Sequence, residues 1–302
     1  MSVLSSLHRR GADPRSRLGT VFVLSGGGSA GAAQVGMLRA LLEAGIVPDA
    51  VVGCSVGALN AASFAVDPTL ERVAALEAIW RSLDRRDLFS SSRRQTVSHL
   101  IRRDAHLYEP DGLHDVIRRA VPVGDLSQTA IPCHVVTTDL ATGRPCYWSA
   151  GDPTQLLAAS ACLPGIFPPV ELGDSLHVDG GVSCPLPSGY AVRLGADRVW
   201  ALDVSGGWIG RRGDRMTALD VLLLSFSISR SLIDRVDDAP RVTRLPRVDA
   251  GNLDLRDFSH TAELVEAGYT TSRAYLAELP VERRGLLRRI PHARRQQHGV
   301  AV

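Results

Sequence analysis

The sequence contains no lysine, and arginine supplies all 34 of its basic residues. Because 32 acidic residues stand against them, the formal net charge at pH 7 is only +2. A chain so close to neutral lacks the basic excess through which proteins hold the phosphates of nucleic acids. We therefore expect no nucleic-acid partner.

Long hydrophobic runs are also missing. The densest apolar cluster, residues 221–224, is interrupted soon afterwards, whereas a membrane-spanning helix needs about 20 consecutive apolar residues. Arg9 and Arg10 follow a weak apolar stretch, which reverses the order that a secretory signal requires. These absences predict a cytoplasmic protein without a transmembrane anchor.

Cysteine is scarce, and its positions form no C-x-x-C pair. An odd number of cysteines scattered through apolar runs is typical of buried free thiols in a reducing compartment. We expect no zinc site from this spacing, and neither another metal nor a cofactor. The five residues are Cys54, Cys133, Cys146, Cys162 and Cys184.

The chain does contain a repeated alternation of strand and helix patterns. This alternation predicts an α/β sandwich with a mostly parallel sheet. We expect a single domain over 18–280, after a disordered lead at 1–17 and before a basic, flexible tail at 281–302. Strands are predicted at 19–24, 49–52, 132–139, 146–149, 175–178 and 198–204, and helices at 32–44, from 58, and at 70–83, 96–102, 113–120, 154–161, 219–236 and 261–279.

One pentapeptide carries the candidate nucleophile, Ser55. It reads Gly-Cys-Ser-Val-Gly over 53–57 and lies between a predicted strand and a helix of small residues. Strand, tight turn and helix form the context of a nucleophile elbow. Gly53 and Gly57 let the backbone turn without a Cβ clash, so that the Ser55 hydroxyl can project into a cleft. The alternative is a structural turn with a surface serine.

A glycine loop, Gly26-x-Gly28-x-x-Gly31, connects the first predicted strand to the first helix. A dinucleotide site needs an acidic residue at the end of the second strand, but that strand runs into Ser55 instead. A phosphate loop needs a Lys-Ser or Lys-Thr pair, which does not follow. We favour an oxyanion hole, because backbone N–H groups at a helix N-terminus face an anion. If the first two strands are neighbours, this loop lies beside Ser55.

A serine hydroxyl needs a base to take its proton, and the usual partner is histidine. The nine histidines lie in polar termini, in the polar middle of the chain, within strands, or before the last helix, and none stands out. Asp179 is the better candidate. It ends a predicted strand, and Gly180 and Gly181 free the backbone to aim its carboxylate into a cleft. An ordinary Asp-Gly turn is the alternative.

Taken together, these motifs resemble the patatin-like phospholipases. The glycine loop, the serine pentapeptide and Asp179-Gly180-Gly181 occur in the order that is typical of that family. The segments 138–143 and 158–169 are also similar to it, so the resemblance spans about 21–204.

The resemblance implies a three-layer α/β/α sandwich and a serine lipid acyl hydrolase of the phospholipase A, lysophospholipase or esterase type. It implies a Ser55–Asp179 dyad without histidine, and lipid acyl esters as substrates. The oxyanion would be bound by the backbone amides of Gly26, Gly27 and Gly28.

Two positions depart from the family pattern. Ala30 stands where the family usually has arginine or lysine, which weakens the case for contact with a phosphate headgroup. Cys184 stands where asparagine is common before a proline, and a thiol is a weak substitute for an amide. Neither departure touches the proposed dyad.

Two other functions fit part of the sequence. One is an α/β-hydrolase esterase in which a late histidine such as His260 completes a Ser–His–Asp triad. The other is a lipid-binding protein with an idle site. Residues 222–233 either pack on the sheet or line an acyl pocket, and the arginine-rich tail either is solvated or rests peripherally on an anionic membrane at the inner surface.

Overall fold

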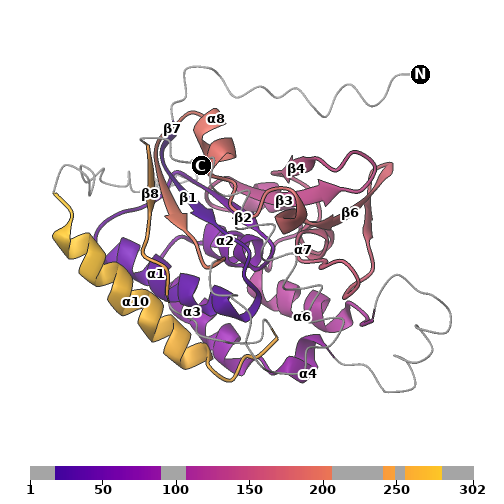
Figure 1. Ribbon diagram of the computed structural model, residues 1–302, viewed down its shortest axis with the longest axis horizontal. Helices are drawn as coiled ribbons and strands as arrows, with labels where there is room; N and C mark the ends of the chain where they lie inside the picture. Colours follow the sequence, from indigo (N-terminus) through magenta and orange to yellow (C-terminus); the bar gives the residue numbers. More distant parts are fainter. Residues whose placement is uncertain (1–17, 90–106, 206–240, 249–255, 281–302) are drawn as a thin grey trace, which may run out of the picture.

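The computed structural model describes residues 18–89, 107–205, 241–248 and 256–280 (Figure 1). The expectations for 1–17, for the helices at 96–102 and 219–236, for an acyl pocket at 222–233 and for the tail at 281–302 lie outside the described residues. Within the described ranges, no helix is both long and apolar enough to cross a bilayer.

A mixed eight-stranded sheet, with the order β5-β6-β3-β2-β1-β7-β8 and with β4 also paired to β3, forms the centre of the described chain. Four strand pairs are parallel and three are antiparallel, so the predicted, mostly parallel sheet is confirmed. The strands are β1 (Leu18–Leu24), β2 (Ala50–Cys54), β3 (Cys133–Asp139), β4 (Pro145–Trp148), β5 (Val170–Leu172), β6 (Ser175–Asp179), β7 (Ala196–Leu202) and β8 (Val242–Arg244).

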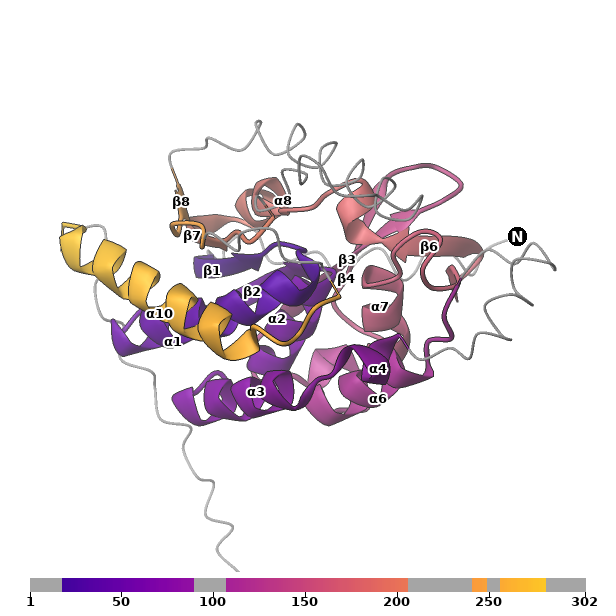
Figure 2. The same ribbon diagram turned by 60° about the horizontal axis from the view of Figure 1, so that its bottom comes forward.

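Helices cover both faces of the sheet, as a three-layer sandwich requires. Figure 2 shows α8 on one side and most of the other helices on the opposite side. The helices are η1 (Gly28–Gly31), α1 (Ala32–Glu43), α2 (Val56–Val66), α3 (Leu70–Ser82), α4 (Arg85–Leu88), α6 (Asp111–Ala120), η2 (Leu126–Gln128), α7 (Pro153–Ser160), η3 (Gly180–Val182), α8 (Ser188–Arg193) and α10 (Thr261–Glu278).

Strands β1 and β2 lie at the centre of the sheet. Every residue of β2 is buried, as are residues 21–24 of β1, which is the pattern of parallel strands covered on both faces. The parallel register pairs Leu24 with Gly53. The first two strands are therefore neighbours, which is the condition that the oxyanion interpretation set, and the glycine loop and the serine turn leave the sheet at the same edge.

Beyond β3 the chain reverses direction. Strand β4 forms a hairpin with β3 and runs antiparallel to it, and β6 also pairs antiparallel with the last residues of β3. A short turn containing Gly173, whose φ is +66°, joins β5 to β6. The antiparallel direction of β6 brings Asp179 back to the edge of the sheet at which β2 ends.

Helices α1 and α10, far apart in sequence, pack side by side (Figure 1). Two glycines allow this approach. A Cβ added to Gly36 would lie 2.0 Å from the carbonyl oxygen of Val265, and one added to Gly268 would lie 2.1 Å from that of Ala33. The backbones therefore touch where neither helix carries a side chain. Tyr269 Oη adds a hydrogen bond of 2.7 Å to Glu43.

Gly36→Ala is expected to destabilise the protein by about 2 kcal/mol or more. Alanine stabilises a helix interior by about 1 kcal/mol relative to glycine, but overpacking against a rigid backbone typically costs about 1–3 kcal/mol and the gap here is unusually small. Urea unfolding monitored by circular dichroism measures the change. Gly124→Ala is the matched control, since its Cβ would meet only Gln128 Oε1 at 3.7 Å. Equal stabilities of the two variants would contradict the account.

On the other face, α8 packs on the sheet through aromatic rings. Tyr190 stacks on Tyr147 with a centroid distance of 3.7 Å, and its hydroxyl lies 3.1 Å from His134 Nδ1. Burial lowers the pKa of His134 from its ordinary 6.5 to about 4. The folded protein therefore holds this imidazole neutral over a range in which the unfolded chain protonates it.

This difference predicts a pH-dependent loss of stability. Because the folded pKa of His134 is depressed, the unfolded state binds more protons between pH 6.5 and 4, and stability falls as the pH falls through that range. Between pH 7 and 4.5 the loss from this group is roughly 2–3 kcal/mol. Unfolding free energies of wild type and His134→Gln at both pH values test it. The variant should show the smaller drop, and identical drops would refute the assignment.

Candidate active site

The turn after β2 holds Ser55 in a strained backbone conformation. Its φ of 55° and ψ of −130° make it the one non-glycine residue with positive φ among the described residues. Such conformations typically cost about 1–3 kcal/mol and persist where the surroundings impose them. Helix α2 begins at the next residue, so strand, strained serine and helix follow one another as in a nucleophile elbow.

The two glycines of the pentapeptide are required by close backbone contacts. A Cβ on Gly53 would lie 2.4 Å from the carbonyl oxygen of Gly57, across the elbow itself. A Cβ on Gly57 would lie 2.4 Å from the carbonyl oxygen of Ser25, just before the glycine loop. The elbow and the glycine loop therefore touch through their backbones.

The structure brings the two predicted catalytic residues together. Ser55 Oγ donates a hydrogen bond of 2.6 Å to Asp179 Oδ2 across 124 positions of sequence. Both side chains are buried, with 7% and 1% of their surface exposed. A hydroxyl has a single proton to donate, and the hydroxyl of Ser55 directs it at the carboxylate of Asp179.

The strand register explains how Asp179 reaches the serine. Cys54 pairs with Val136 across β2 and β3, so Ser55 is level with Thr137, and Thr137 pairs with Asp179 across β3 and β6. Gly180 then lets the chain pass close to β3, since a Cβ there would lie 2.3 Å from the carbonyl oxygen of Val136.

The carboxylate of Asp179 is itself held in place. Its Oδ1 accepts a hydrogen bond of 2.7 Å from the backbone N–H of Gly181, while its own N–H donates to the carbonyl oxygen of Cys162 at 2.9 Å. Burial beside Asp179 raises the pKa of the Cys162 thiol to about 12, so this thiol stays protonated. One carboxylate oxygen of Asp179 thus accepts a hydrogen bond from the backbone, and the other accepts one from Ser55.

Ser160, to which the sequence assigned no role, supports the elbow. Its Oγ accepts a hydrogen bond of 2.9 Å from the backbone N–H of Ser55 and donates one of 2.7 Å to the carbonyl oxygen of Val136. The side chain is fully buried at the end of α7. In the sequence, Ser160 is notable only because it lies in the segment 158–169 that resembles the family. A serine among alanines gives no local indication of a contact with a residue 105 positions away.

Ser160→Ala is expected to lower both stability and any activity that depends on Ser55. It leaves a buried N–H and a buried carbonyl without partners, which typically costs about 1–3 kcal/mol. Thermal unfolding and ester turnover measure the two effects. Ser63→Ala is the matched control, since Ser63 Oγ is buried without a hydrogen-bond partner in the described structure. Equal effects of the two substitutions would show that the Ser160 bonds are unimportant.

The glycine loop lies beside the elbow, but its three predicted amide donors are not equivalent. The N–H of Gly26 already donates to the carbonyl oxygen of Pro185 at 3.3 Å. The N–H groups of Gly27 and Gly28 have no acceptor among the described residues. Gly28, with a φ of 57°, lines the cavity at Ser55, and a Cβ on Gly31 would lie 2.7 Å from the Val56 side chain. Of the three predicted oxyanion donors, the amides of Gly27 and Gly28 are therefore the two without an acceptor in the described structure.

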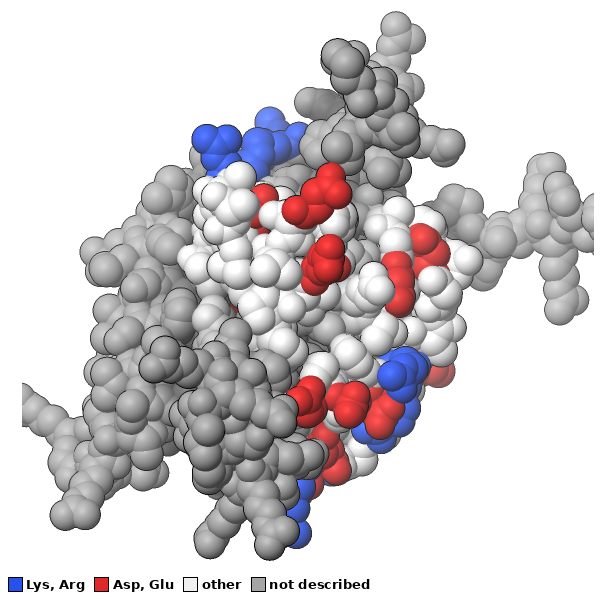
Figure 3. Space-filling model, turned by 90° about the vertical axis from the view of Figure 1, so that its right-hand side faces the viewer, with Lys and Arg blue, Asp and Glu red and all other residues white. Residues whose placement is uncertain are grey.

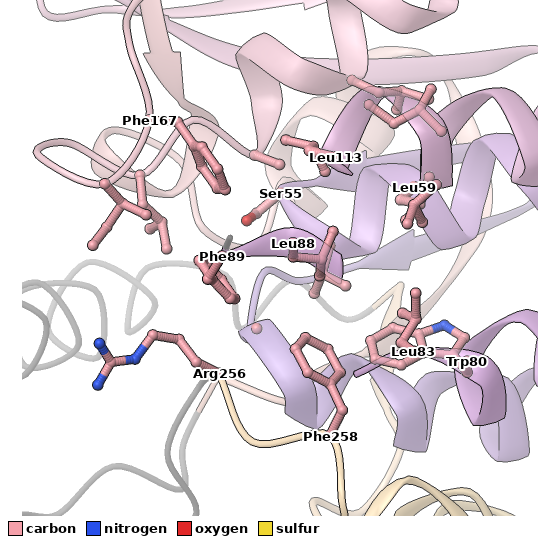
Figure 4. Close-up of a pocket in the computed structure, with 18 residues that line it drawn as sticks. Ser55, Leu59, Trp80, Leu83, Leu88, Phe89, Leu113, Phe167, Arg256 and Phe258 are labelled. Carbon is pink, nitrogen blue, oxygen red and sulfur yellow. The ribbon is translucent and has the colours of Figure 1, made fainter. Parts of the chain in front are cut away.

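An apolar pocket opens at Ser55. Figure 4 shows the hydroxyl of Ser55 among Phe89, Phe167 and Leu113, while Trp80 and Leu83 lie further along the pocket. Arg256 is the only charged residue in the lining that the described chain supplies, and its side chain extends outwards at one end. The remaining lining residues are Gly28, Val56, Leu59, Leu88, Val116, Ile117, Leu157, Ala161, Leu163, Ile166 and Phe258.

Two of the described histidines that could be considered as a base have other partners. His177, 3% exposed, lies with its Nδ1 3.0 Å from Thr137 Oγ1. His260, the candidate for a triad, pairs with Glu263 Oε2 at 3.0 Å at the exposed start of α10. Because the Ser55 proton is already directed to Asp179, the recorded geometry gives neither histidine the position of the base in a triad.

Comparisons with known proteins agree with the motifs. A family profile described as patatin-like phospholipase matches residues 22–192. An uncharacterized NTE family protein of Mycobacterium bovis is 27% identical over 250 residues, which are 78% of this chain and 65% of that protein. Lysophospholipase nte1 of Aspergillus terreus is 32% identical over 190 residues, covering 60% of this chain and 12% of the fungal protein.

Patatin-like phospholipase domain-containing protein 7 of Rattus norvegicus is 30% identical over 184 residues, covering 60% of this chain and 13% of the rat protein. The crystal structure of VipD from Legionella pneumophila matches with a TM-score of 0.45 and 13% identity, over 86% of this chain and 66% of that one. The chain thus spans less than two thirds of the mycobacterial relative and a small part of the fungal and rat proteins.

Proposed function

We propose that this chain, which belongs to the patatin-like phospholipase family, hydrolyses carboxylic esters of lipid acyl chains with Ser55 as nucleophile and Asp179 as base. The observation that carries the proposal is the 2.6 Å hydrogen bond between their side chains at the end of an apolar pocket. A serine and a base in contact, beside free backbone amides, form the arrangement that acyl transfer requires.

In the first step Asp179 Oδ2 takes the proton of Ser55 Oγ as the oxygen attacks the ester carbonyl carbon. The bond length already suits proton transfer, which needs heavy atoms about 2.6–3.2 Å apart. The N–H of Gly181 donates to the other carboxylate oxygen and so favours the ionised form that a base must have. The protonated Asp179 then gives its proton to the oxygen of the departing alcohol.

The negative charge that develops on the carbonyl oxygen needs donors that are already in place. The amides of Gly27 and Gly28 are proposed for this role, since the Gly26 amide is occupied by Pro185. Each such donor is typically worth about 3 kcal/mol in the transition state. The loop continues into η1 and α1, whose N-terminal end also favours negative charge.

Deacylation uses the same groups with water as the nucleophile. Asp179 takes a proton from water, and the hydroxide attacks the acyl carbon on Ser55. When the tetrahedral intermediate collapses, Ser55 Oγ leaves and recovers its proton from Asp179. The products are a free fatty acid and the enzyme in its starting state, so the cycle balances without a further reactant.

The apolar pocket favours the acyl chain as the part of the substrate that the protein binds. Its lining is almost wholly hydrocarbon and comes from α2, α3, α4, α6 and α7, from the glycine loop, and from the segments at 161–167 and 256–258. On the face shown in Figure 3, acidic side chains spread over the described surface and basic ones lie at its margins. Contact with an anionic membrane through the arginine-rich tail stays a prediction from the sequence.

Hydrolysis of p-nitrophenyl octanoate tests the dyad. Ser55→Ala and Asp179→Asn should each lower kcat by at least about a thousandfold, because nucleophile and base act as a unit. A fluorophosphonate probe should label Ser55 in wild type and fail to label Ser55→Ala.

His260→Ala serves as the control, since the proposal predicts wild-type activity for it and a triad predicts none. Asp174→Asn, an exposed aspartate in the β5–β6 turn, is the matched control for the charge change. Turnover that survives in Ser55→Ala or Asp179→Asn would disprove the dyad. A wild-type protein that neither hydrolyses the ester nor reacts with the probe would favour the idle lipid-binding function.

A further inference from the structure

We propose that Gln34, Asn60 and Trp80 form a buried chain of hydrogen bonds that positions the glycine loop for catalysis. These are positioning residues that act through the loop, not groups that touch the reacting atoms. The inference rests on the proposed function of the loop as an oxyanion hole.

The chain of hydrogen bonds begins with the side-chain amide of Gln34, at the start of α1. Its Nε2 donates to the carbonyl oxygen of Ser25 at 2.8 Å and to that of Leu202, at the end of β7, at 3.0 Å. Ser25 immediately precedes Gly26, the first residue of the glycine loop. The Gln34 amide therefore connects the start of this loop with the neighbouring strand β7. The side chain is fully buried.

Asn60, on α2, continues the chain to the exit of the loop. Its Nδ2 donates to the carbonyl oxygen of Gly31 at 2.9 Å and to Gln34 Oε1 at 2.9 Å. Its Oδ1 accepts a hydrogen bond of 2.8 Å from the indole N–H of Trp80, on α3. The loop is thus held at both ends by side chains of α1 and α2, and Trp80 of α3 holds Asn60 in turn.

The groups at its two ends determine the direction of every hydrogen bond in this network. Main-chain carbonyl oxygens can only accept and an indole N–H can only donate, so each amide fits in one orientation. All four amide protons of Gln34 and Asn60 have acceptors. A fully satisfied buried network rigidifies its surroundings, whereas a partly satisfied one is costly.

The loop needs such support because it has little means of fixing itself. Residues 26–31 are glycine except for Ser29 and Ala30. Glycine gives the backbone more freedom than any other residue and offers no side chain for packing. The direction of the Gly27 and Gly28 amides therefore depends on contacts made from outside the loop.

Trp80 has a second role that makes a sharp test possible. Its ring lines the apolar pocket, while its N–H is the far end of the hydrogen-bond chain. Trp80→Phe removes the donor and keeps an aromatic wall. If the chain positions the oxyanion donors, the substitution weakens an interaction made in the transition state, so kcat falls and KM stays nearly constant.

The expected fall in kcat is about tenfold to a hundredfold. Loss of a whole oxyanion donor costs about 10²–10³ in kcat, and a misplacement of about 1 Å can cost about a hundredfold. The matched control is Trp200→Phe, because the Trp200 indole N–H is buried without a hydrogen-bond partner in the described structure. Leu83→Ala, which changes the pocket wall and not the hydrogen-bond chain, should mainly raise KM.

The experiment measures kcat and KM for p-nitrophenyl octanoate in wild type, Trp80→Phe, Trp200→Phe, Leu83→Ala and Ser55→Ala. A second readout is the affinity of octylboronic acid, whose tetrahedral serine adduct imitates the intermediate. This affinity should fall in Trp80→Phe by a factor similar to that in kcat. Should Trp80→Phe lose its cooperative thermal transition, Asn60→Ser tests the chain from its centre with the same expectation.

The outcomes separate this inference from the proposed function. A lowered kcat with unchanged KM in Trp80→Phe, and near wild-type values in Trp200→Phe, support the positioning role. If Trp80→Phe loses no more kcat than Trp200→Phe, or changes only KM, the inference is wrong while an inactive Ser55→Ala still supports the dyad. A wild-type protein without esterase activity contradicts the proposed function and this inference with it.

Discussion

The hydrogen bond from Ser55 to Asp179 places the strictest demands on the rest of the structure. It joins residues 124 positions apart at 2.6 Å, and it does so at a crowded edge of the sheet where several backbone segments meet. Gly53, Gly57 and Gly180 are needed because a Cβ at any of them would lie within 2.5 Å of another backbone atom. The glycine pattern of the sequence thus reflects the lack of space around the serine and aspartate.

Holding this arrangement requires support from buried polar groups. The strained backbone of Ser55 is tied by Ser160 to β3, Asp179 is tied by Gly181 and Cys162, and the glycine loop is tied by Gln34 and Asn60. Because unpaired polar groups are costly away from water, each bond specifies one position for its partner. The pocket beside them is lined almost wholly by hydrocarbon, and Arg256 is the only charged side chain that the described residues contribute to its lining.

Much of this could be predicted from local patterns. Glycines around a serine after a buried strand indicate an elbow, and the parallel pairing of β1 with β2 follows from two short buried strands joined by a helix. The contacts that aim the groups could not be predicted. Ser160, the Gly26 amide bound to Pro185 and the Gln34 bond to Leu202, 168 positions away, depend on tertiary proximity that leaves no local signal. The short elements α4, α8, β5 and β8 also went unpredicted, since each spans only a few residues.

The most direct measurement is the identification of the residue that carries the acyl group during turnover. Acid quenching of the reaction with p-nitrophenyl octanoate, followed by proteolysis and tandem mass spectrometry, locates the adduct. We predict one octanoyl group on Ser55. The fraction of enzyme that carries it should be higher during turnover than after the substrate is exhausted. An octanoyl group on the neighbouring Cys54 or on a histidine, or turnover that leaves Ser55 unmodified at every time point, would contradict it.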